Sequence, residues 1–312
     1  MHRLNSTGPR RRSRRLPLTG AALGAALLLS ACGAELQRGY LPEPVTENGP
    51  LVISLWNGTW IAGLAVGVLV WGIILWAIVA YRARKDDRSL PVQVRYNIPL
   101  EILYTVVPVL MVAVLYGKTV EVQNELLATD EEADVVVNVV GKKWSWDFNY
   151  VNEDVHVVGT QAIELSEGQE GVRDTLPTMV LPVDSRIEFQ LTARDVIHSF
   201  WVPQFLQKLD MIPGRVNVFQ VVTTEEGSFD GKCAELCGAY HSQMLFNVDV
   251  VSQDEYDAFI ADLEAAGNTG QLDNGLNQYD LYDDPNVQDF YPDERVIRVP
   301  MGEEQSSTED DN

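Results

Sequence analysis

The residues of this chain best suited to chemistry are concentrated at positions 233–244. Two thiols, one imidazole and one thioether lie there, and a second imidazole lies 35 positions before the first thiol: Cys233, Cys237, His241, Met244 and His198. These side chains form a soft nitrogen and sulfur ligand set, which favours copper over hard cations such as Mg²⁺ or Ca²⁺. A loop between two strands can gather the first four round one point, while His198 arrives from a neighbouring strand. The pattern therefore predicts a metal site.

The number of thiols distinguishes the possible sites. A single blue-copper centre needs one Cys, two His and a weak axial Met, which leaves Cys233 surplus. Two coppers bridged by both thiolates use every donor, because each copper is then capped by one His and one weak ligand, either Met244 or a backbone carbonyl. Three other interpretations remain open at this point: one copper, a four-ligand zinc site, or a structural disulfide between Cys233 and Cys237.

Short β-strands are expected to position these ligands. Runs rich in β-branched or aromatic residues alternate with Gly, Pro and polar turns, at 134–140, 144–151, 178–183, 186–192, 197–203, 215–222 and 243–251. Such a series predicts a β-sandwich or Greek-key barrel. Residues 152–175 are expected to form a polar surface insertion. Ser252 and Glu255 form a capping box that predicts a helix over 252–266.

Two apolar segments precede these strands. Residues 55–80 and 98–117 are each long enough to cross a membrane. The second segment carries Glu101 near its start and Pro108 in its middle, which predicts a kink. The loop 82–97 between them holds Arg and Lys residues, and such charge keeps a loop cytoplasmic. We therefore expect a transmembrane two-helix hairpin over 51–118, with both mature termini outside a bacterial cell membrane.

The first 31 residues have the features of an export signal, because a cluster of Arg precedes an apolar run. The run ends in Leu29-Ser30-Ala31-Cys32. Small residues before a Cys resemble the lipobox of bacterial lipoproteins, in which the Cys is acylated and becomes the new N-terminus. Cys32 is therefore predicted to be a lipidation site, with residues 32–50 extracytoplasmic; the alternative is an uncleaved anchor helix.

The chain is strongly acidic, with 23 Lys and Arg against 45 Asp and Glu and a formal net charge of −22. Its 46% of hydrophobic residues is too high for a disordered chain, and its charge argues against nucleic acid as a partner. Residues 268–312 hold 12 of the acids and show no clear periodicity. This tail is expected to be extended or disordered unless a partner orders it.

The ligand segment resembles subunit II of haem-copper cytochrome c oxidases. The resemblance rests on the pattern Cys-x-Glu-x-Cys-x3-His-x2-Met from Cys233 to Met244, on His198 within Ile-His-Ser-Phe-Trp-Val-Pro, and on Asp-Met-Ile-Pro-Gly-Arg at 210–215. It covers about residues 50–265 and implies a cupredoxin-like domain over 119–267 with a binuclear CuA centre. The implied copper ligands are His198, Cys233, Cys237, His241, Met244 and the carbonyl of Glu235. The side chain of Glu235 is implied to reach a Mg²⁺ or Mn²⁺ at the boundary with subunit I.

The resemblance also implies roles for two residues outside the ligand set. Trp144, Trp146 and Phe148 share one face of a predicted strand, a pattern that by itself indicates core packing. Trp144, however, falls where the family accepts electrons from its donor. Glu101 falls where the family has a Glu at the mouth of a proton path into subunit I.

The implied function is that of one subunit of a proton-translocating oxidase, with oxidase subunits I and III as partners. The donor is cytochrome c or a cytochrome-bearing reductase. Asp195 matches an acidic docking position of the family, whereas Lys142 and Lys143 would repel a basic cytochrome. Two alternatives are a membrane-tethered copper carrier or assembly protein and a CuA reductase of nitrogen oxides. The two predicted spans and Glu101 favour the oxidase, because a carrier needs only a lipid or one helix.

Overall fold

The computed structural model describes residues 33–82, 90, 93–162 and 173–276. The predicted signal segment, Cys32, most of the loop 82–97, residues 163–172 and residues 277–312 lie outside this description. The chain divides into a first unit ending at Leu41, which contains the short helix α2 (Gly33–Gln37), and a second unit from Pro42 onwards.

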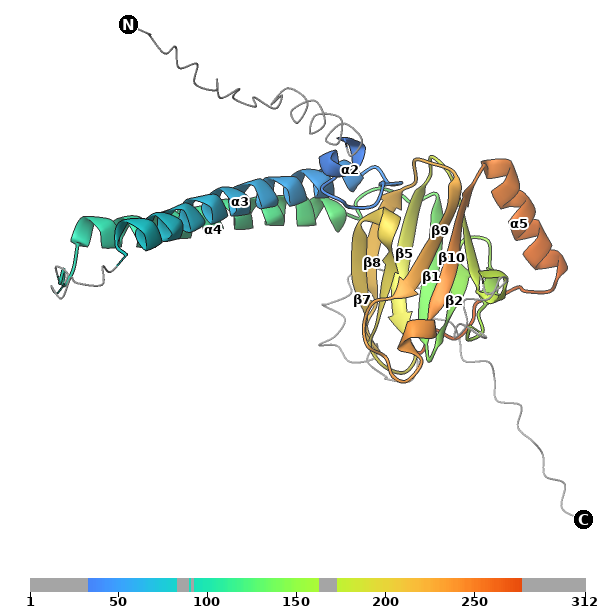
Figure 1. The fold of residues 1–312 in the computed structure, drawn as a ribbon. Coiled ribbons are helices and arrows are strands. Elements are labelled where there is room, and N and C mark those ends of the chain that lie inside the picture. Colours follow the sequence, from blue (N-terminus) through green and yellow to red (C-terminus); the bar gives the residue numbers. More distant parts are fainter. Residues whose placement is uncertain (1–32, 83–89, 91–92, 163–172, 277–312) are drawn as a thin grey trace, which may run out of the picture. The chain divides into compact units, whose positions relative to one another are not determined.

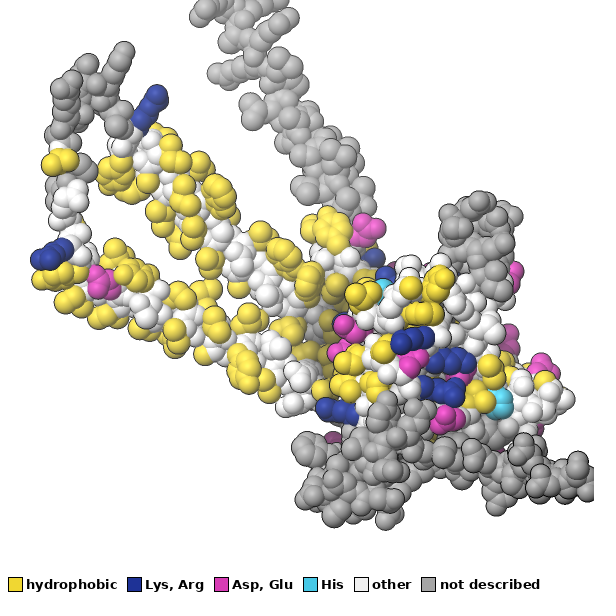
Figure 2. Space-filling view, turned by 90° about the horizontal axis from the view of Figure 1, so that it is seen from below, with side chains coloured by type: hydrophobic (Ala, Val, Ile, Leu, Met, Phe, Trp, Pro, Cys, Tyr) yellow, Lys and Arg dark blue, Asp and Glu magenta, His cyan; other side chains and the backbone are white. Residues whose placement is uncertain are grey.

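Two long helices begin the second unit, α3 (Gly49–Ala80) and α4 (Ile98–Leu126). Both are long and apolar enough to cross a membrane, and their most apolar stretches are not buried in the protein. Figure 2 shows the hydrophobic side chains that cover them. α4 extends beyond the apolar span predicted over 98–117, because the helix continues to Leu126. Its last turns are polar but helical, with Lys118 paired to Glu121 at 2.6 Å.

The rest of the second unit is a sandwich of two five-stranded sheets (Figure 1), which confirms the predicted fold class. The first sheet has the order β3-β2-β1-β5-β8 and consists of β1 (Val135–Lys142), β2 (Ser145–Tyr150), β3 (Val155–Val158), β5 (Arg186–Ala193) and β8 (Asn217–Val222). The second sheet has the order β4-β10-β9-β6-β7 and consists of β4 (Thr178–Pro182), β6 (His198–Val202), β7 (Gln207–Met211), β9 (Gly227–Cys233) and β10 (Leu245–Val251). The pairs β1–β5 and β4–β10 are parallel, and the other pairs are antiparallel.

Aromatic side chains from both sheets fill the space between them. Trp146 contacts Phe246 with ring centroids 4.9 Å apart, and Phe200 stacks on Phe246 at 5.3 Å. Phe189 continues the cluster at 5.2 Å from Phe200. These side chains are at most 1% exposed, and burial of each contributes roughly 1.5–3 kcal/mol. The core thus forms a rigid base beneath the loops at the ends of the strands.

Three strands were missed by the sequence analysis. β3 lies within residues 152–175, which were predicted to form a surface loop. That prediction is wrong for residues 155–158, because they pair with β2 and Val155 is buried. β7 and β9 carry Lys, Asp or Gly at many positions, so they lack the β-branched and aromatic runs on which the prediction relied.

Segments at both ends of the second unit attach to the sandwich. Before α3, Val45 is buried in the core, and its amide donates to the carbonyl of Gln204 at 3.1 Å. At the other end, α5 (Gln253–Ala265) begins with the predicted capping box of Ser252 and Glu255. The first part of the predicted tail, residues 268–276, is held on the first sheet by hydrogen bonds such as His156 N to Asn268 O, at 3.0 Å.

Candidate metal centre

The loop between β9 and β10 carries most of the predicted ligands. Cys233 is the last residue of β9, and Met244 directly precedes β10. A hydrogen bond of 3.0 Å from the amide of Cys233 to the carbonyl of Met244 closes the loop at its base. His198 begins β6, which pairs with β9 where Phe200 lies opposite Cys233. Strand pairing therefore brings His198 to this loop across 35 positions of sequence.

The predicted ligand atoms converge on one small volume. The sulfur of Cys233 lies 3.9 Å from that of Cys237 and 3.8 Å from Nδ1 of His198. The sulfur of Cys237 lies 3.6 Å from Nδ1 of His241 and 3.7 Å from Sδ of Met244. The carbonyl oxygen of Glu235 lies 3.2 Å from the sulfur of Cys233. Both cysteines are free thiols and are buried.

These distances group the donors in two halves about the thiol pair. Nδ1 of His198 and the carbonyl of Glu235 lie beside Cys233, and Nδ1 of His241 and Sδ of Met244 lie beside Cys237. Each half offers one imidazole and one weak donor. Two thiols, two imidazoles and two weak donors thus lie around one small volume, and the soft donors suit copper.

Asp195 holds the imidazole of His198 from the far side. Its Oδ1 lies 2.8 Å from Nε2 of His198, and its carboxylate also accepts the amides of Lys143 and Val196, both at 2.7 Å. A carboxylate on the outer ring nitrogen fixes the tautomer and orientation of a ligating histidine. This contact was not predicted from the sequence, where Asp195 was expected to dock the donor. Its only signal was the spacing of three residues from His198.

The two thiols differ in acidity. Burial opposes ionisation of Cys233, but its hydrogen bonds with His198, Glu235 and Ser199 outweigh burial and lower its pKa from 9.0 to about 7. Burial raises the pKa of Cys237 to about 12, and the neighbouring charge of Cys233 adds to the increase. Burial also opposes the charged form of His198, yet its hydrogen bonds to Cys233 and Asp195 raise its pKa overall.

Two glycines make room for the rings at this site. A Cβ on Gly141 would lie 3.1–3.3 Å from the ring and Cβ of His198. Gly238 has a φ of +127°, and a Cβ there would lie 3.1 Å from the indole of Trp144. Glycine at both positions therefore allows the backbone to approach a functional side chain closely.

Trp144 lies in the turn between β1 and β2 rather than in a strand, so the prediction that it shares a strand face with Trp146 was wrong. Its indole Nε1 donates to the carbonyl of Cys237 at 3.2 Å, and the ring of Tyr240 packs edge-on at 4.9 Å. Trp146 is fully buried in the core, as packing alone predicts. Trp144 is the half-buried aromatic that contacts the ligand loop directly.

The two lysines before Trp144 have different environments. Lys142 pairs with Asp147, Nζ to Oδ1, at 2.6 Å, and Asp147 is almost completely buried. Lys143 is exposed. The carboxylate of Asp195 is already bonded to His198 and to two amides. The exposed charged side chain next to Trp144 in the sequence is that of Lys143.

Two further predicted site groups are the carboxylates of Glu101 and Glu235. Glu101 lies in the first turn of α4, where its Oε1 accepts the amide of Asn97 at 2.9 Å. The side chain of Glu235 is exposed on the ligand loop. Cys32 lies outside the described residues.

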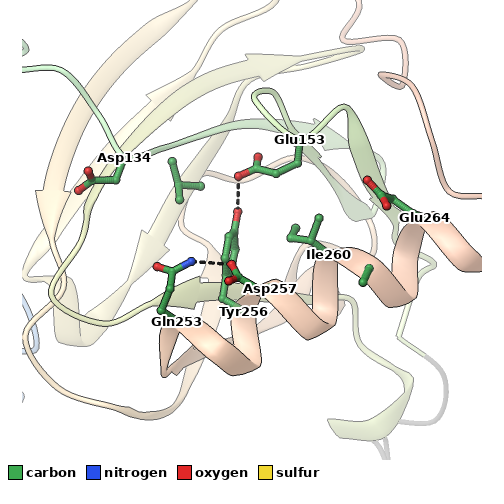
Figure 3. Close-up of a pocket in the computed structure, with 9 residues that line it drawn as sticks. Asp134, Glu153, Gln253, Tyr256, Asp257, Ile260 and Glu264 are labelled. Carbon is green, nitrogen blue, oxygen red and sulfur yellow. Dashed lines mark hydrogen bonds between the residues drawn. The ribbon is translucent and has the colours of Figure 1, made fainter.

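A separate hollow of about 300 Å³ lies where α5 packs on the sandwich (Figure 3). Its lining includes Asp134, Glu153, Asp257 and Glu264, and the hydroxyl of Tyr256 donates to Glu153 at 2.9 Å. Burial raises the pKa of Tyr256, and the charge of Glu153 raises it further, so the phenol stays neutral. None of the predicted site residues lines this hollow.

Known proteins resemble this chain in sequence. Residues 135–251 fit the family profile described as cytochrome c oxidase subunit II, periplasmic domain. A relative from Streptomyces avermitilis, named probable cytochrome c oxidase subunit 2, is 43% identical over 299 residues, which cover 86% of this chain and 93% of the relative. The chain belongs to the cytochrome c oxidase subunit 2 family. The resemblance inferred from the ligand motif is thereby confirmed.

Two further proteins similar to this chain come from other bacteria. The subunit 2 of Mycobacterium tuberculosis is 37% identical over 303 residues, covering 82% of this chain and 83% of its own length. The solved periplasmic domain of subunit II (CoxB) of Bradyrhizobium japonicum is 30% identical and aligns with a TM-score of 0.38 over 44% of this chain and 97% of that chain. As a member of the family, the chain is one subunit of an oxygen-reducing oxidase in the membrane, with the sandwich as its extracytoplasmic domain.

Proposed function

We propose that this subunit holds two coppers at the paired thiols and receives electrons there for the oxidase. The observation that carries the proposal is the convergence of two thiols, two imidazoles and two weak donors on one small volume about Cys233 and Cys237. When bound, a thiolate-bridged copper pair shares one electron, so its geometry changes little on reduction. Four of the donor residues are buried, and the core beneath them would hold their positions during reduction: His198, Cys233, Cys237 and Met244.

The other metal assignments leave donors unused. A structural zinc site takes four ligands in a tetrahedron, so the thioether of Met244 and the carbonyl of Glu235 would lie beside the thiols without a role. A blue-copper centre takes a single thiolate. Both alternatives therefore explain the local donor set less completely than a copper pair.

Trp144 is proposed to receive electrons from the donor. Its indole is partly exposed and is bonded to the carbonyl of Cys237. That bond provides a short route from the surface of the domain to a thiolate ligand. Electrons then pass to haem in subunit I, where oxygen is reduced to water and protons are translocated.

The side chains of Glu235 and Glu101 are proposed to act towards subunit I. The exposed carboxylate of Glu235 is a hard oxygen ligand suited to Mg²⁺ or Mn²⁺, and the remaining ligands would come from the partner subunit. Glu101 would take protons into subunit I near the cytoplasmic end of α4. Cys32 would carry a lipid, and both mature termini would lie outside. Subunit III would complete the complex.

Copper content and electron paramagnetic resonance test the copper proposal. The purified oxidase should contain two coppers in this subunit, with one unpaired electron coupled to both nuclei. Cys233→Ser and Cys237→Ser should each abolish that spectrum. A four-line spectrum from a single copper would contradict the proposal.

We further propose that the donor is a cytochrome held beside the oxidase by its reductase. Exposed Lys143 beside Trp144 and the engagement of Asp195 both disfavour brief docking of a basic cytochrome. A tethered donor has a high effective concentration and depends little on salt, whereas steered encounters weaken steeply with ionic strength. Quinol-driven respiration of mildly solubilised membranes should therefore persist at raised salt, and the oxidase should co-purify with a quinol:cytochrome c reductase. An oxidase that isolates alone and needs added soluble cytochrome c would contradict the proposal.

A further inference from the structure

The chain after α5 runs back along the first sheet, and we call residues 268–276 the C-terminal strap. The strap begins on β3, where Thr269 forms an isolated bridge with Val155. The amide of His156 donates to the carbonyl of Asn268 at 3.0 Å, and the amide of Gly270 donates to the carbonyl of Asp154 at 2.7 Å. The start of the strap is thus bound to the edge of the sheet by its backbone.

The middle of the strap is held by β2. Asn149 is fully buried, and its side chain bonds both backbone groups of Leu272: Nδ2 donates to the carbonyl at 3.0 Å, and Oδ1 accepts the amide at 2.8 Å. Gln271 adds a bond from Nε2 to the carbonyl of Tyr150 at 3.1 Å. A side-chain amide that satisfies a backbone donor and acceptor together fixes the position of that residue along the strand.

The end of the strap reaches Arg194, the residue directly after β5. Nη2 of Arg194 donates to Asp273 at 3.2 Å. Gly275 has a φ of +77°, and a Cβ there would lie 2.8 Å from Cα of Arg194. Leu276 is 1% exposed. The strap therefore packs against both the backbone and the side chain of Arg194.

Arg194 lies where the turn between β1 and β2 meets the loop between β5 and β6. Its amide donates to the carbonyl of Gly141 at 3.0 Å, and its Nη1 lies 3.8 Å from the buried carboxylate of Asp147. Its neighbour Asp195 accepts the amide of Lys143. One of these loops carries Trp144, and the other leads into His198. β1 and β5 end side by side, with Gly141 opposite Ala193, so both loops leave the sheet at the same place.

We propose that the C-terminal strap is a positioning element for the metal centre. The strap fixes Arg194, and Arg194 holds the Trp144 turn against the loop that carries Asp195 and leads into His198. The expected effect on copper reduction rests on the proposed function. The effect of the strap on the position of the Trp144 turn does not depend on copper. The hydrogen bonds of the strap given above join it to β2, β3 and Arg194.

Two truncations and one point variant test the strap in the purified oxidase. A chain that ends at residue 276 keeps the strap, and a chain that ends at 267 removes it. Asp273→Asn weakens its contact with Arg194, and Asp257→Asn, on α5, is the matched control. Each variant is characterised in two ways. The first is hydrogen exchange of peptides covering 141–147 and 193–199. The second is the behaviour of the coppers, given by their hyperfine pattern and their rate of reduction by the donor.

The chain ending at 276 and Asp257→Asn should match the wild type in both measurements. Removal of the strap should speed exchange in the two peptides, alter the hyperfine pattern and slow reduction, and Asp273→Asn should do the same to a smaller extent. If the chain ending at 267 does not accumulate, Asp273→Asn decides alone. Wild-type exchange and wild-type reduction in Asp273→Asn, or in an intact chain ending at 267, would overturn the proposal. If the strap variants change hydrogen exchange but the wild-type oxidase shows no signal from coppers in this subunit, the proposed function is contradicted. The role of the strap in positioning the two loops is then still supported.

Discussion

Asp195 bonds Nε2 of His198 at 2.8 Å, which leaves Nδ1 of the same ring on the side of Cys233, 3.8 Å from its sulfur. With Asp195 as the acceptor, Nε2 carries the proton of the neutral imidazole, and Nδ1 is left as the donor atom for the proposed copper. Burial opposes the negative charge of Asp195, but its hydrogen bonds with His198, Lys143 and Val196 together outweigh burial and lower the pKa of the carboxyl. The carboxylate therefore stays ionised as the partner of the histidine.

Asp195→Asn should loosen this orientation. Loss of such an outer partner typically costs about 10–100-fold in metal affinity or activity, so copper should be lost to a chelator at about 10–100 times lower chelator concentration. Asp230→Asn, which removes a different surface ion pair with Arg173, is the control. Wild-type copper retention and an unchanged spectrum in Asp195→Asn would show that the bond does not orient the ligand.

The acidity of the two thiols predicts the proton release that accompanies copper binding. The thiol of Cys233, with a pKa of about 7, is protonated below that pH and ionised above it, whereas Cys237, at about 12, stays protonated across the range. Metal binding expels thiol protons. The thiols should therefore release about one proton per chain at pH 8.5 and close to two at pH 5.5, and copper should bind more weakly at the lower pH.

Calorimetry of copper binding to the copper-free subunit, in two buffers with different ionisation enthalpies, measures this number. The raised pKa of His198 acts in the same direction, because a protonated ring must also lose its proton. Equal proton release at both pH values would contradict the assignment.

Trp144→Phe should separate electron transfer from copper binding. Phenylalanine keeps an aromatic ring beside Tyr240 but removes the indole donor to the carbonyl of Cys237. The near-infrared absorbance of the coppers should stay close to that of the wild type, while reduction by the donor slows. Stopped-flow mixing measures the rate. Reduction at the wild-type rate would exclude Trp144 from the route.

Glu101→Gln should slow the proton-dependent steps of oxygen reduction and leave copper reduction fast. Glu101 also accepts the amide of Asn97 at the start of α4, so a loss of helix capping must be distinguished from a loss of proton transfer. Asn97→Ala weakens the cap and keeps the carboxylate, and replacement of an N-cap residue by Ala typically costs about 0.5–2 kcal/mol. Turnover lost equally in both variants would indicate capping rather than proton uptake.

Cys32 should become the first residue of the mature subunit and carry a lipid. Intact mass of the purified subunit measures this directly. Cys32→Ala should leave the subunit in the membrane, because α3 and α4 still anchor it. A mature chain that begins at Met1 would contradict both cleavage and lipidation.

Features that depend on local spacing could be predicted from the sequence. The ligands from Cys233 to Met244 lie on one short loop, so their spacing alone predicted a shared site. The two spans followed from continuous hydrophobicity, and the start of α5 followed from the capping box at Ser252. Such signals require no knowledge of which segments lie side by side.

Contacts that depend on strand pairing became known from the folded chain. His198 meets Cys233 because β6 pairs with β9, a strand whose Gly and charged residues concealed it from the sequence analysis. Asp195 proved to be the partner of that histidine, and Trp144 proved to lie in a turn against Cys237. A carboxylate or an indole has the same local signature on a docking surface, in a core or beside a ligand. Its role is set by the side chains that distant segments bring within hydrogen-bonding distance, and those are determined when the two sheets pair and pack.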